Sequence, residues 1–95
     1  MIKSFAKGPA EKIWQGTTLQ GKFIPGSLVK IAKRKLEILH AATELNELRL
    51  PPGNKLEKLQ GNLAAFYSIR INDQFRIIFK WKDGNAFDVD ILDYH

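Results

Sequence analysis

The stretch LAAFYSIRINDQFRIIFKWKDGNAFDVDILDYH, residues 63–95, decides the fold. Apolar and polar residues alternate within it, and the apolar positions are mostly β-branched or aromatic. This alternation runs through residues 67–71, 75–81 and 87–92. A period of two with these residue types predicts half-buried β-strands. The sequence therefore predicts three consecutive strands, with the odd-numbered residues facing the core.

Two short segments of turn-forming residues separate these strands. The first is Asn72-Asp73-Gln74, and the second is Lys82-Asp83-Gly84-Asn85. Asp-Gly is a strong hairpin signal because glycine tolerates a positive φ. We therefore expect an antiparallel meander with two tight turns.

Three cations share the face of this meander opposite the core, because side chains alternate along a strand. They are Arg70, Arg76 and Lys80. One interpretation is a solvated outer face with cross-strand pairs to Asp88 and Asp90. The other is a surface that holds a phosphodiester, because guanidinium groups bind phosphate through paired hydrogen bonds.

The first quarter of the chain predicts a short strand and a short helix. Residues 2–5 form the strand, with Ile2 facing the core, and Gly8-Pro9 breaks the chain after it. A helix from Pro9 to about Gln15 follows, with Gly16 as its stop. Residues 17–26 contain two Gly and one Pro and have no clear period, which predicts a mobile loop.

The main helix is predicted over residues 27–42, with Ser27 as its N-cap. Its apolar residues recur at helical spacing and form one stripe. They are Leu28, Ile31, Ala32, Leu36, Leu39 and Ala42. Outside the stripe, Lys30, Lys33 and Arg34 form either a phosphate-contacting ridge or a solvated face, and His40 is expected to be exposed.

The segment after this helix predicts a turn that Thr43 caps, a rigid connection at residues 51–54 and an extended edge segment around Leu56 and Leu59. Together with the meander, these elements predict an α+β fold. One small, mainly antiparallel sheet carries two N-terminal helices on one face. We expect residues 1–95 to form a single domain.

Composition narrows the class of protein. The chain has 95 residues and a net charge of +5. Residues 1–35 carry eight basic residues and one acidic residue, and residues 36–95 carry seven basic and nine acidic residues. Such a basic region favours polyanions, although ordinary solubility is the alternative.

No cysteine is present, so neither a disulfide framework nor a thiolate metal site is expected. The two histidines, His40 and His95, are far apart and form no ligand pattern. No run approaches the length of a membrane span, and no signal peptide follows Met1. We expect a cytoplasmic protein without membrane association, metal or other cofactor.

The residues quoted so far resemble the HigB branch of the RelE/ParE toxin superfamily. The matching features span almost the whole chain. They are the opening residues 1–5, Ala41-Ala42-Thr43, Leu56-x-x-Leu59-x-Gly61-Asn62, Tyr67-Ser68-Ile69, Arg76 after an aromatic residue, and the terminal Asp93-Tyr94-His95. The segments 51–54 and 68–74 are most similar to the GraT-like members.

The resemblance implies a RelE-like fold and the toxin of a type II toxin–antitoxin pair. Such toxins cut mRNA in the ribosomal A site, and a HigA-like helix-turn-helix antitoxin silences them. Operator DNA would be contacted only through the antitoxin. Two alternatives stay open: a ParE-like gyrase poison, and a weakly catalytic module that binds its antitoxin and represses an operon.

Metal-free RNA cleavage needs a base for the 2′-OH proton, cations for the charged phosphorane and an acid for the leaving 5′-oxygen. His95 is the expected acid or base because its pKa lies near neutrality, and the carboxylate of Asp93 favours its protonated form. Arg76 and Arg70 are expected to bind the scissile phosphate. Tyr94 is expected to stack on a base or share in proton transfer.

This chain departs from the resembled family before the meander. The family pattern His-Pro-Leu-Lys-Gly corresponds to Glu57-Lys58-Leu59-Gln60-Gly61 here. Glu57 is then a candidate base. Lys58 is a candidate cation, although strand alternation points it to the opposite side. Slower cleavage or an altered codon preference is the expected consequence.

Overall fold

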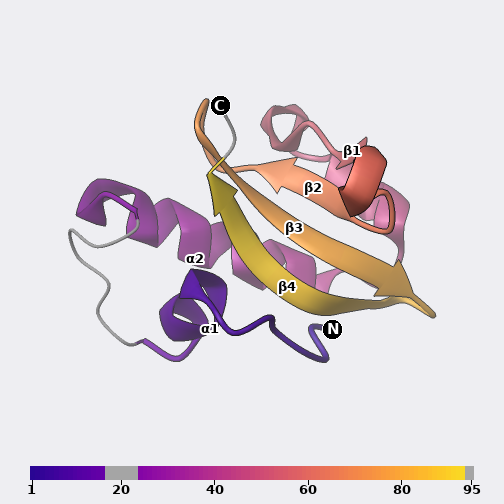
Figure 1. The fold of residues 1–95 in the computed structure, drawn as a ribbon, viewed down its shortest axis with the longest axis horizontal. Coiled ribbons are helices and arrows are strands. Elements are labelled where there is room, and N and C mark those ends of the chain that lie inside the picture. The colour runs from indigo at the N-terminus through magenta and orange to yellow at the C-terminus, as the bar shows by residue number, and fades with distance from the viewer. Residues whose placement is uncertain (17–23, 94–95) are drawn as a thin grey trace.

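The computed structural model describes residues 1–16 and 24–93. Its sheet has four antiparallel strands in the order β1-β2-β3-β4. These are β1 (Glu57–Lys58), β2 (Tyr67–Arg70), β3 (Phe75–Lys82) and β4 (Asn85–Asp93). The predicted meander and edge segment are therefore confirmed, and β1 forms the edge beside β2 (Figure 1).

The helices also follow the prediction closely. They are α1 (Pro9–Trp14) and α2 (Gly26–Ala41). The predicted N-cap of α2 is wrong, because Pro25 holds that position and Ser27 lies inside the first turn. Pro25 fixes its own φ and prevents the helix from extending further toward the N-terminus. The predicted loop at 17–26 lies mostly outside the described residues.

Two short 3-10 helices, η1 (Leu45–Arg49) and η2 (Pro52–Asn54), connect α2 to the sheet, and a third, η3 (Gly61–Leu63), lies between β1 and β2. The predicted cap of η1 is wrong by one residue, since Glu44 holds the N-cap position. Thr43 still takes part, because its hydroxyl donates to Glu47 Oε2 at 2.8 Å. The carboxylate of Glu47 also accepts the backbone N–H of Glu44 at 3.0 Å.

A single apolar core lies between the helices and the odd-numbered face of the sheet. α2 passes behind β3 and β4, and α1 lies beside β4 (Figure 1). The strands contribute Ile69, Ile71, Phe75, Ile77, Phe79, Ala86, Val89 and Ile91, and the helices contribute Ala10, Ile13, Ala32, Leu36 and Leu39. The predicted α+β arrangement with helices on one face is thus confirmed.

A β-bulge in β4 corrects the predicted alternation. Ile78 pairs with Asp90, whereas Lys80 pairs with Phe87, so Asp88 and Val89 together oppose Phe79. The extra residue shifts the strand by one position. Phe87 therefore shares the face of Lys80, and Ala86 takes the core position that the sequence assigned to Phe87. Asp88 holds a left-handed φ of 52° at this point.

The N-terminal segment lies beside β4, and the strand predicted over residues 2–5 is present only as two isolated bridges. Ile2 and Phe5 form parallel bridges with Ala86 and Val89. His40, which we expected to be exposed, is half-buried here: its Nδ1 accepts the backbone N–H of Ile2 at 3.1 Å. Its ring lies 5.2 Å from that of Trp14. The exposure prediction is wrong because the chain end folds back over the last turn of α2.

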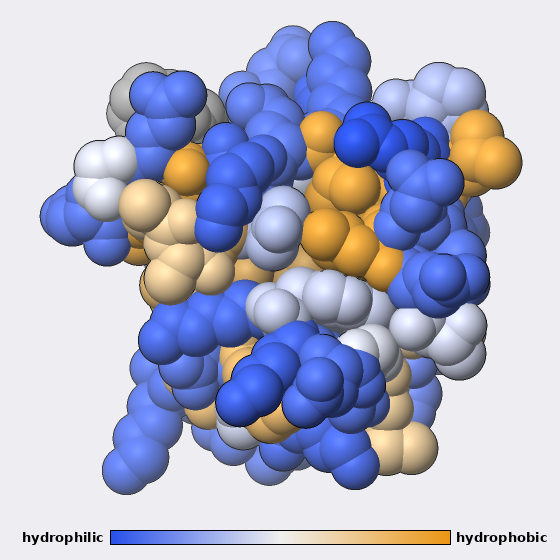
Figure 2. All heavy atoms as spheres, turned by 90° about the vertical axis from the view of Figure 1, so that its right-hand side faces the viewer, coloured by the Kyte–Doolittle hydropathy of each residue, from blue (hydrophilic) through white to orange (hydrophobic). Residues whose placement is uncertain are grey.

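The surface seen from the side of the β3–β4 turn is mainly hydrophilic, with apolar side chains gathered near its centre and at its edges (Figure 2). The large apolar side chains exposed in the described part of the chain are Met1 and Leu50. No helix among the described residues is long and apolar enough to cross a membrane.

Candidate functional site

The face of the sheet opposite the core carries a buried guanidinium. Arg76 lies in the interior of β3 and is only 7% exposed. Its Nε donates to Ser68 Oγ at 2.7 Å, and its Nη2 donates to the Lys55 carbonyl at 2.7 Å. The same Nη2 lies 3.2 Å from Glu57 Oε1. Burial with hydrogen-bonding partners on several sides fixes the orientation of this side chain.

The strand register brings Glu57, Ser68 and Arg76 to one face. Glu57 is paired with Ser68 across β1 and β2, and Arg70 is paired with Arg76 across β2 and β3. Directly opposite residues of antiparallel strands project to the same side of a sheet. The structure therefore brings together three residues that the sequence singled out for catalysis or phosphate binding: Glu57, Arg70 and Arg76.

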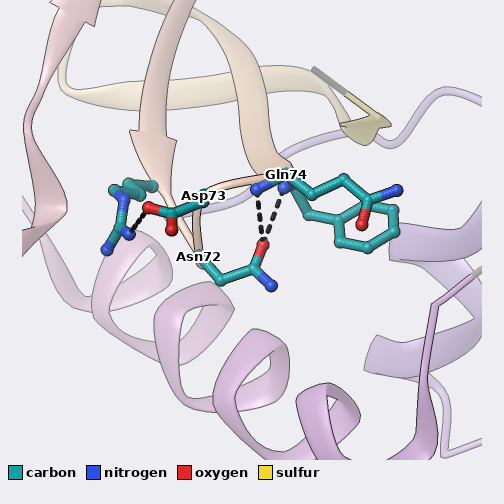
Figure 3. A network of polar contacts seen from close by, with 5 residues as sticks. Asn72, Asp73 and Gln74 are labelled. Atoms are coloured by element: carbon teal, nitrogen blue, oxygen red, sulfur yellow. Dashed lines mark hydrogen bonds and ion pairs between the residues drawn. The ribbon is translucent and has the colours of Figure 1, made fainter. Parts of the chain in front are cut away.

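The turn between β2 and β3 holds the two arginine-bearing strands together. Asn72 Oδ1 accepts the backbone N–H groups of Gln74 at 3.0 Å and Phe75 at 2.8 Å (Figure 3). The guanidinium of Arg70 forms an ion pair with Asp73 in the same turn. This ion pair therefore directs the Arg70 guanidinium toward the turn.

A hollow of about 310 Å³ lies next to this cluster. It is lined by Glu57, Lys58, Leu59, Gln60 and Leu63. These residues belong to β1 and the segment that follows it, which is where the chain departs from the resembled pattern. Glu57 contacts Arg76 and also lines this hollow, so its carboxylate connects the buried guanidinium with an open space.

The other predicted cations lie elsewhere. Lys58 projects to the opposite side of β1 from Glu57, as alternation predicted, with its Nζ 4.7 Å from the centre of the Tyr67 ring. Lys80 lies 3.2 Å from Asp88 and faces the ring of Phe66. A cross-strand pair to Asp88, which the interpretation as a solvated face expected, is therefore present. Lys33 and Arg34 lie on α2, and Arg34 is exposed.

Of the last three residues of the predicted site, the structure describes Asp93. Asp93 ends β4 and is paired with Phe75, so the register places it on the core side of the sheet rather than beside Arg76. Its carboxylate accepts the side-chain N–H of Gln74 at 3.2 Å. Tyr94 and His95 lie outside the described residues, and their roles stay predictions.

Sequence reasoning missed two side chains that support the cluster. Ser68 is fully buried and accepts from Arg76, and Asn54 is fully buried beside Lys35. The position of Ser68 between two apolar residues of a strand was the available signal, because it shares a face with Arg76. Asn54 gave no signal, since Pro-Pro-Gly-Asn is typical of an exposed turn.

The family of this protein is shown by a match over almost the whole chain, and not by this cluster of residues alone. Residues 3–95 match the family model of the HigB-like toxin, described as the RelE-like toxin of the type II toxin–antitoxin system HigB. The chain belongs to this family. As a type II toxin, a HigB-like protein has an antitoxin as its partner. The predicted family membership and the predicted toxin function are therefore confirmed.

Curated relatives agree with this assignment. Toxin HigB-1 of Vibrio cholerae is 50% identical over 74 residues, which cover 78% of this chain and 77% of that protein. Endoribonuclease HigB of Proteus vulgaris is 30% identical over 95 residues, which cover both chains completely. This HigB-like chain is thus the homologue of an endoribonuclease, as the sequence predicted.

Solved structures confirm the RelE-like fold. The crystal structure of the heterotetrameric YoeB–YefM toxin–antitoxin complex from Staphylococcus aureus contains a chain with a TM-score of 0.61 and 22% identity. The match covers 100% of this chain and 98% of that one. A second YoeB–YefM complex from the same organism gives a TM-score of 0.57.

Proposed function

We propose that this HigB-like toxin is a metal-independent endoribonuclease that cuts mRNA in the ribosomal A site and thereby blocks translation and growth. The observation that carries the proposal is the Glu57 carboxylate, which lies 3.2 Å from the buried Arg76 guanidinium and lines an open hollow. A carboxylate and a fixed cation are two of the three groups that RNA cleavage needs. The endoribonuclease name of the Proteus vulgaris relative supports the same activity.

The proposed reaction is an internal transesterification. Glu57 accepts the proton of the 2′-OH, and the 2′-oxygen forms a bond to phosphorus. The bond from phosphorus to the 5′-oxygen then breaks, and His95 gives this oxygen its proton. Arg76 and Arg70 stabilise the charge on the phosphorane, and Tyr94 stacks on a neighbouring base. Asp93 favours the protonated form of His95.

The cations outside the cluster have a separate proposed role. Lys58, Lys80, Lys33 and Arg34 would contact RNA phosphates away from the scissile bond. Such contacts strengthen binding without selecting a sequence, and their contribution falls as salt rises. Substitution of one of these residues should therefore weaken binding more than it lowers the rate of the bound complex.

The proposed partner is a HigA-like helix-turn-helix antitoxin, through which alone the toxin would contact operator DNA. The first 35 residues carry eight basic residues and one acidic residue. An acidic antitoxin would be attracted to this region, and its association rate should fall as salt rises. We place this reaction and its silencing in the cytoplasm.

The proposal can be tested by incubating the purified toxin with ribosomes that carry mRNA. Free mRNA without ribosomes, and ribosomes with mRNA in the presence of a metal chelator, are the parallel conditions. Cleavage that requires the ribosome and persists in the chelator supports the proposal. Intact mRNA together with gyrase-linked DNA breaks would establish the ParE-like alternative instead. Intact mRNA and intact DNA, with operator repression retained in the antitoxin complex, would establish the regulatory module.

A further inference from the structure

Asn54, at the end of η2, is a fully buried polar residue that the proposed reaction does not use. Its Nδ2 donates to the carbonyl oxygens of Leu48 and Leu50, both at 3.2 Å. Its Oδ1 accepts from the Nζ of Lys35, which comes from α2. One buried carboxamide therefore ties together the main helix and two points of the segment before β1. A buried amide with such partners is costly to replace.

The residue after Asn54 has an unusual backbone. Lys55 adopts the left-handed conformation, with φ 44° and ψ 58°. This conformation costs a residue with a Cβ about 1–2 kcal/mol, so the contacts on either side must impose it. The backbone N–H of Asn54 donates to Pro51 at 2.9 Å, and that of Lys55 donates to Pro52 at 3.2 Å. The fixed carboxamide and these turns hold Lys55 in place.

The left-handed turn directs the Lys55 carbonyl at Arg76. The carbonyl accepts from Arg76 Nη2 at 2.7 Å, and this is the nitrogen that lies 3.2 Å from Glu57. A displacement of Lys55 would therefore change the position of Nη2 relative to the Glu57 carboxylate. α2 contacts Asn54, Asn54 holds its own turn, and Lys55 in that turn contacts Arg76. Together these contacts connect α2 with the guanidinium.

We propose that Asn54 is a positioning residue for Arg76, which acts by holding the Lys55 carbonyl against the guanidinium. Lys35 anchors Asn54 to α2. This inference rests on the proposed function for its kinetic consequence, because the guanidinium must matter to cleavage before its position can.

A double-mutant cycle separates positioning from mere stabilisation of the fold. Asn54→Asp keeps the size and the acceptor for Lys35, but it replaces the donor to Leu48 and Leu50 by an oxygen. In single-turnover cleavage on programmed ribosomes, it should lower the rate about tenfold in the wild-type background. In the Arg76→Ala background it should change the rate by less than about twofold, because coupled residues are not additive. Equal losses in both backgrounds would overturn the inference.

One further measurement, a second variant and a control variant make the test independent of activity and of folding problems. The exchange rate of the Arg76 Nη2 protons, which the Lys55 carbonyl faces, is measured by NMR and should rise in Asn54→Asp, and an unchanged rate would overturn the inference. Lys35→Met removes the anchor but keeps both carbonyl contacts of Asn54, so it replaces Asn54→Asp if that variant does not fold. Asn46→Ala removes an exposed asparagine of η1 whose Oδ1 accepts from Arg49, and it should change neither quantity.

The outcomes distinguish this inference from the proposed function. If Arg76→Ala alone cleaves at the wild-type rate, the proposed role of Arg76 fails, and the NMR measurement still decides whether Asn54 positions the guanidinium. If Arg76→Ala is slow while the losses multiply in the cycle, the proposed function stands and the positioning role fails.

Discussion

The carboxylate of Glu57 lies 3.2 Å from the guanidinium of Arg76, although the two residues are separated by the whole of β2. The side chain of Arg76 is 9% exposed and that of Glu57 is 51% exposed. The pair therefore joins a fixed, buried cation to a carboxylate that solvent and substrate can reach. In a reaction that creates a charged phosphorane, this arrangement places the base next to the charge stabiliser.

Arg76→Ala should slow cleavage on the order of 10²-fold, because it removes preorganised charge stabilisation. Arg76→Lys should recover only part of the loss, since an ammonium cannot reproduce the paired donors of a guanidinium. Single-turnover cleavage on programmed ribosomes measures both. Because Arg76 also holds Ser68 and Lys55, each variant needs a denaturation curve that shows it is folded under assay conditions. A folded Arg76→Ala protein with the wild-type rate would contradict the role of Arg76.

Glu57→Gln should lower the cleavage rate roughly 10²–10⁴-fold, the usual contribution of one general base. The amide keeps the shape and one oxygen that Arg76 can bind, so antitoxin binding and stability should change little. Gln60→Glu changes the charge at another residue that lines the same hollow and is the control for a general effect of charge there. If Glu57→Gln cleaves within about threefold of wild type, a change worth less than about 0.7 kcal/mol, the carboxylate is not the base.

His95→Gln should also lower the rate roughly 10²–10⁴-fold if the imidazole is the acid. The rate of the wild-type toxin should then decline as pH rises through the pKa of this acid, and the variant should lack that decline. Two findings would count against the assignment. One is an unchanged rate, and the other is a pH profile that His95→Gln leaves intact.

The strands, the turns and the two helices could be predicted well from the sequence because each of them depends on a local residue pattern. Ile69, Ile77 and Phe79 alternate clearly, and Asp83-Gly84 occupies the left-handed positions that a tight hairpin requires. The bulge at Asp88 was not predictable in this way. Alternation continues through Phe87 in the sequence, and only pairing with Phe79 reveals the extra residue.

The sequence predicted that Glu57, Arg70 and Arg76 belong to the candidate site, but it did not predict the environment of these residues. Alternation placed Arg70 and Arg76 on one face and Lys58 on the opposite side from Glu57, and the register agrees. The burial of Arg76 depends on the Lys55 carbonyl, a backbone atom 21 positions away along the chain. No residue pattern specifies such a contact, because it depends on how the turn at Asn54 is held.

Asp88→Val should lower the free energy of unfolding by about 1–3 kcal/mol, because a β-branched residue is poorly suited to a left-handed φ of 52°. The variant also loses the contact with Lys80, which as an exposed pair contributes at most about 1 kcal/mol. Asp88→Asn removes the charge but tolerates this backbone, so it should lose much less. Urea denaturation measures both. Equal losses in the two variants would show that the side-chain contacts, rather than the bulge backbone, determine the effect.

Glu47 should make the toxin less stable as the solution becomes acidic. The hydroxyl of Thr43 holds the pKa of this carboxyl below its ordinary value near 4.5, and the backbone N–H groups of Thr43 and Glu44 add to the effect. A lowered pKa means that the unfolded chain binds the proton more readily than the folded one. The stabilisation is therefore complete above the ordinary pKa and is lost as pH falls through the lower, folded-state pKa.

Glu47→Gln should remove this contribution, so its stability and that of wild type should converge as pH falls from about 6 to about 3. Thr43→Val removes the largest cause and should move the NMR titration of the Glu47 carboxyl toward higher pH. Denaturation curves across this range, recorded together with that titration, check both statements. A wild-type titration at or above the ordinary Glu value would show that the Thr43 hydroxyl does not stabilise the carboxylate. A constant stability difference between wild type and Glu47→Gln at every pH would exclude proton linkage at this residue.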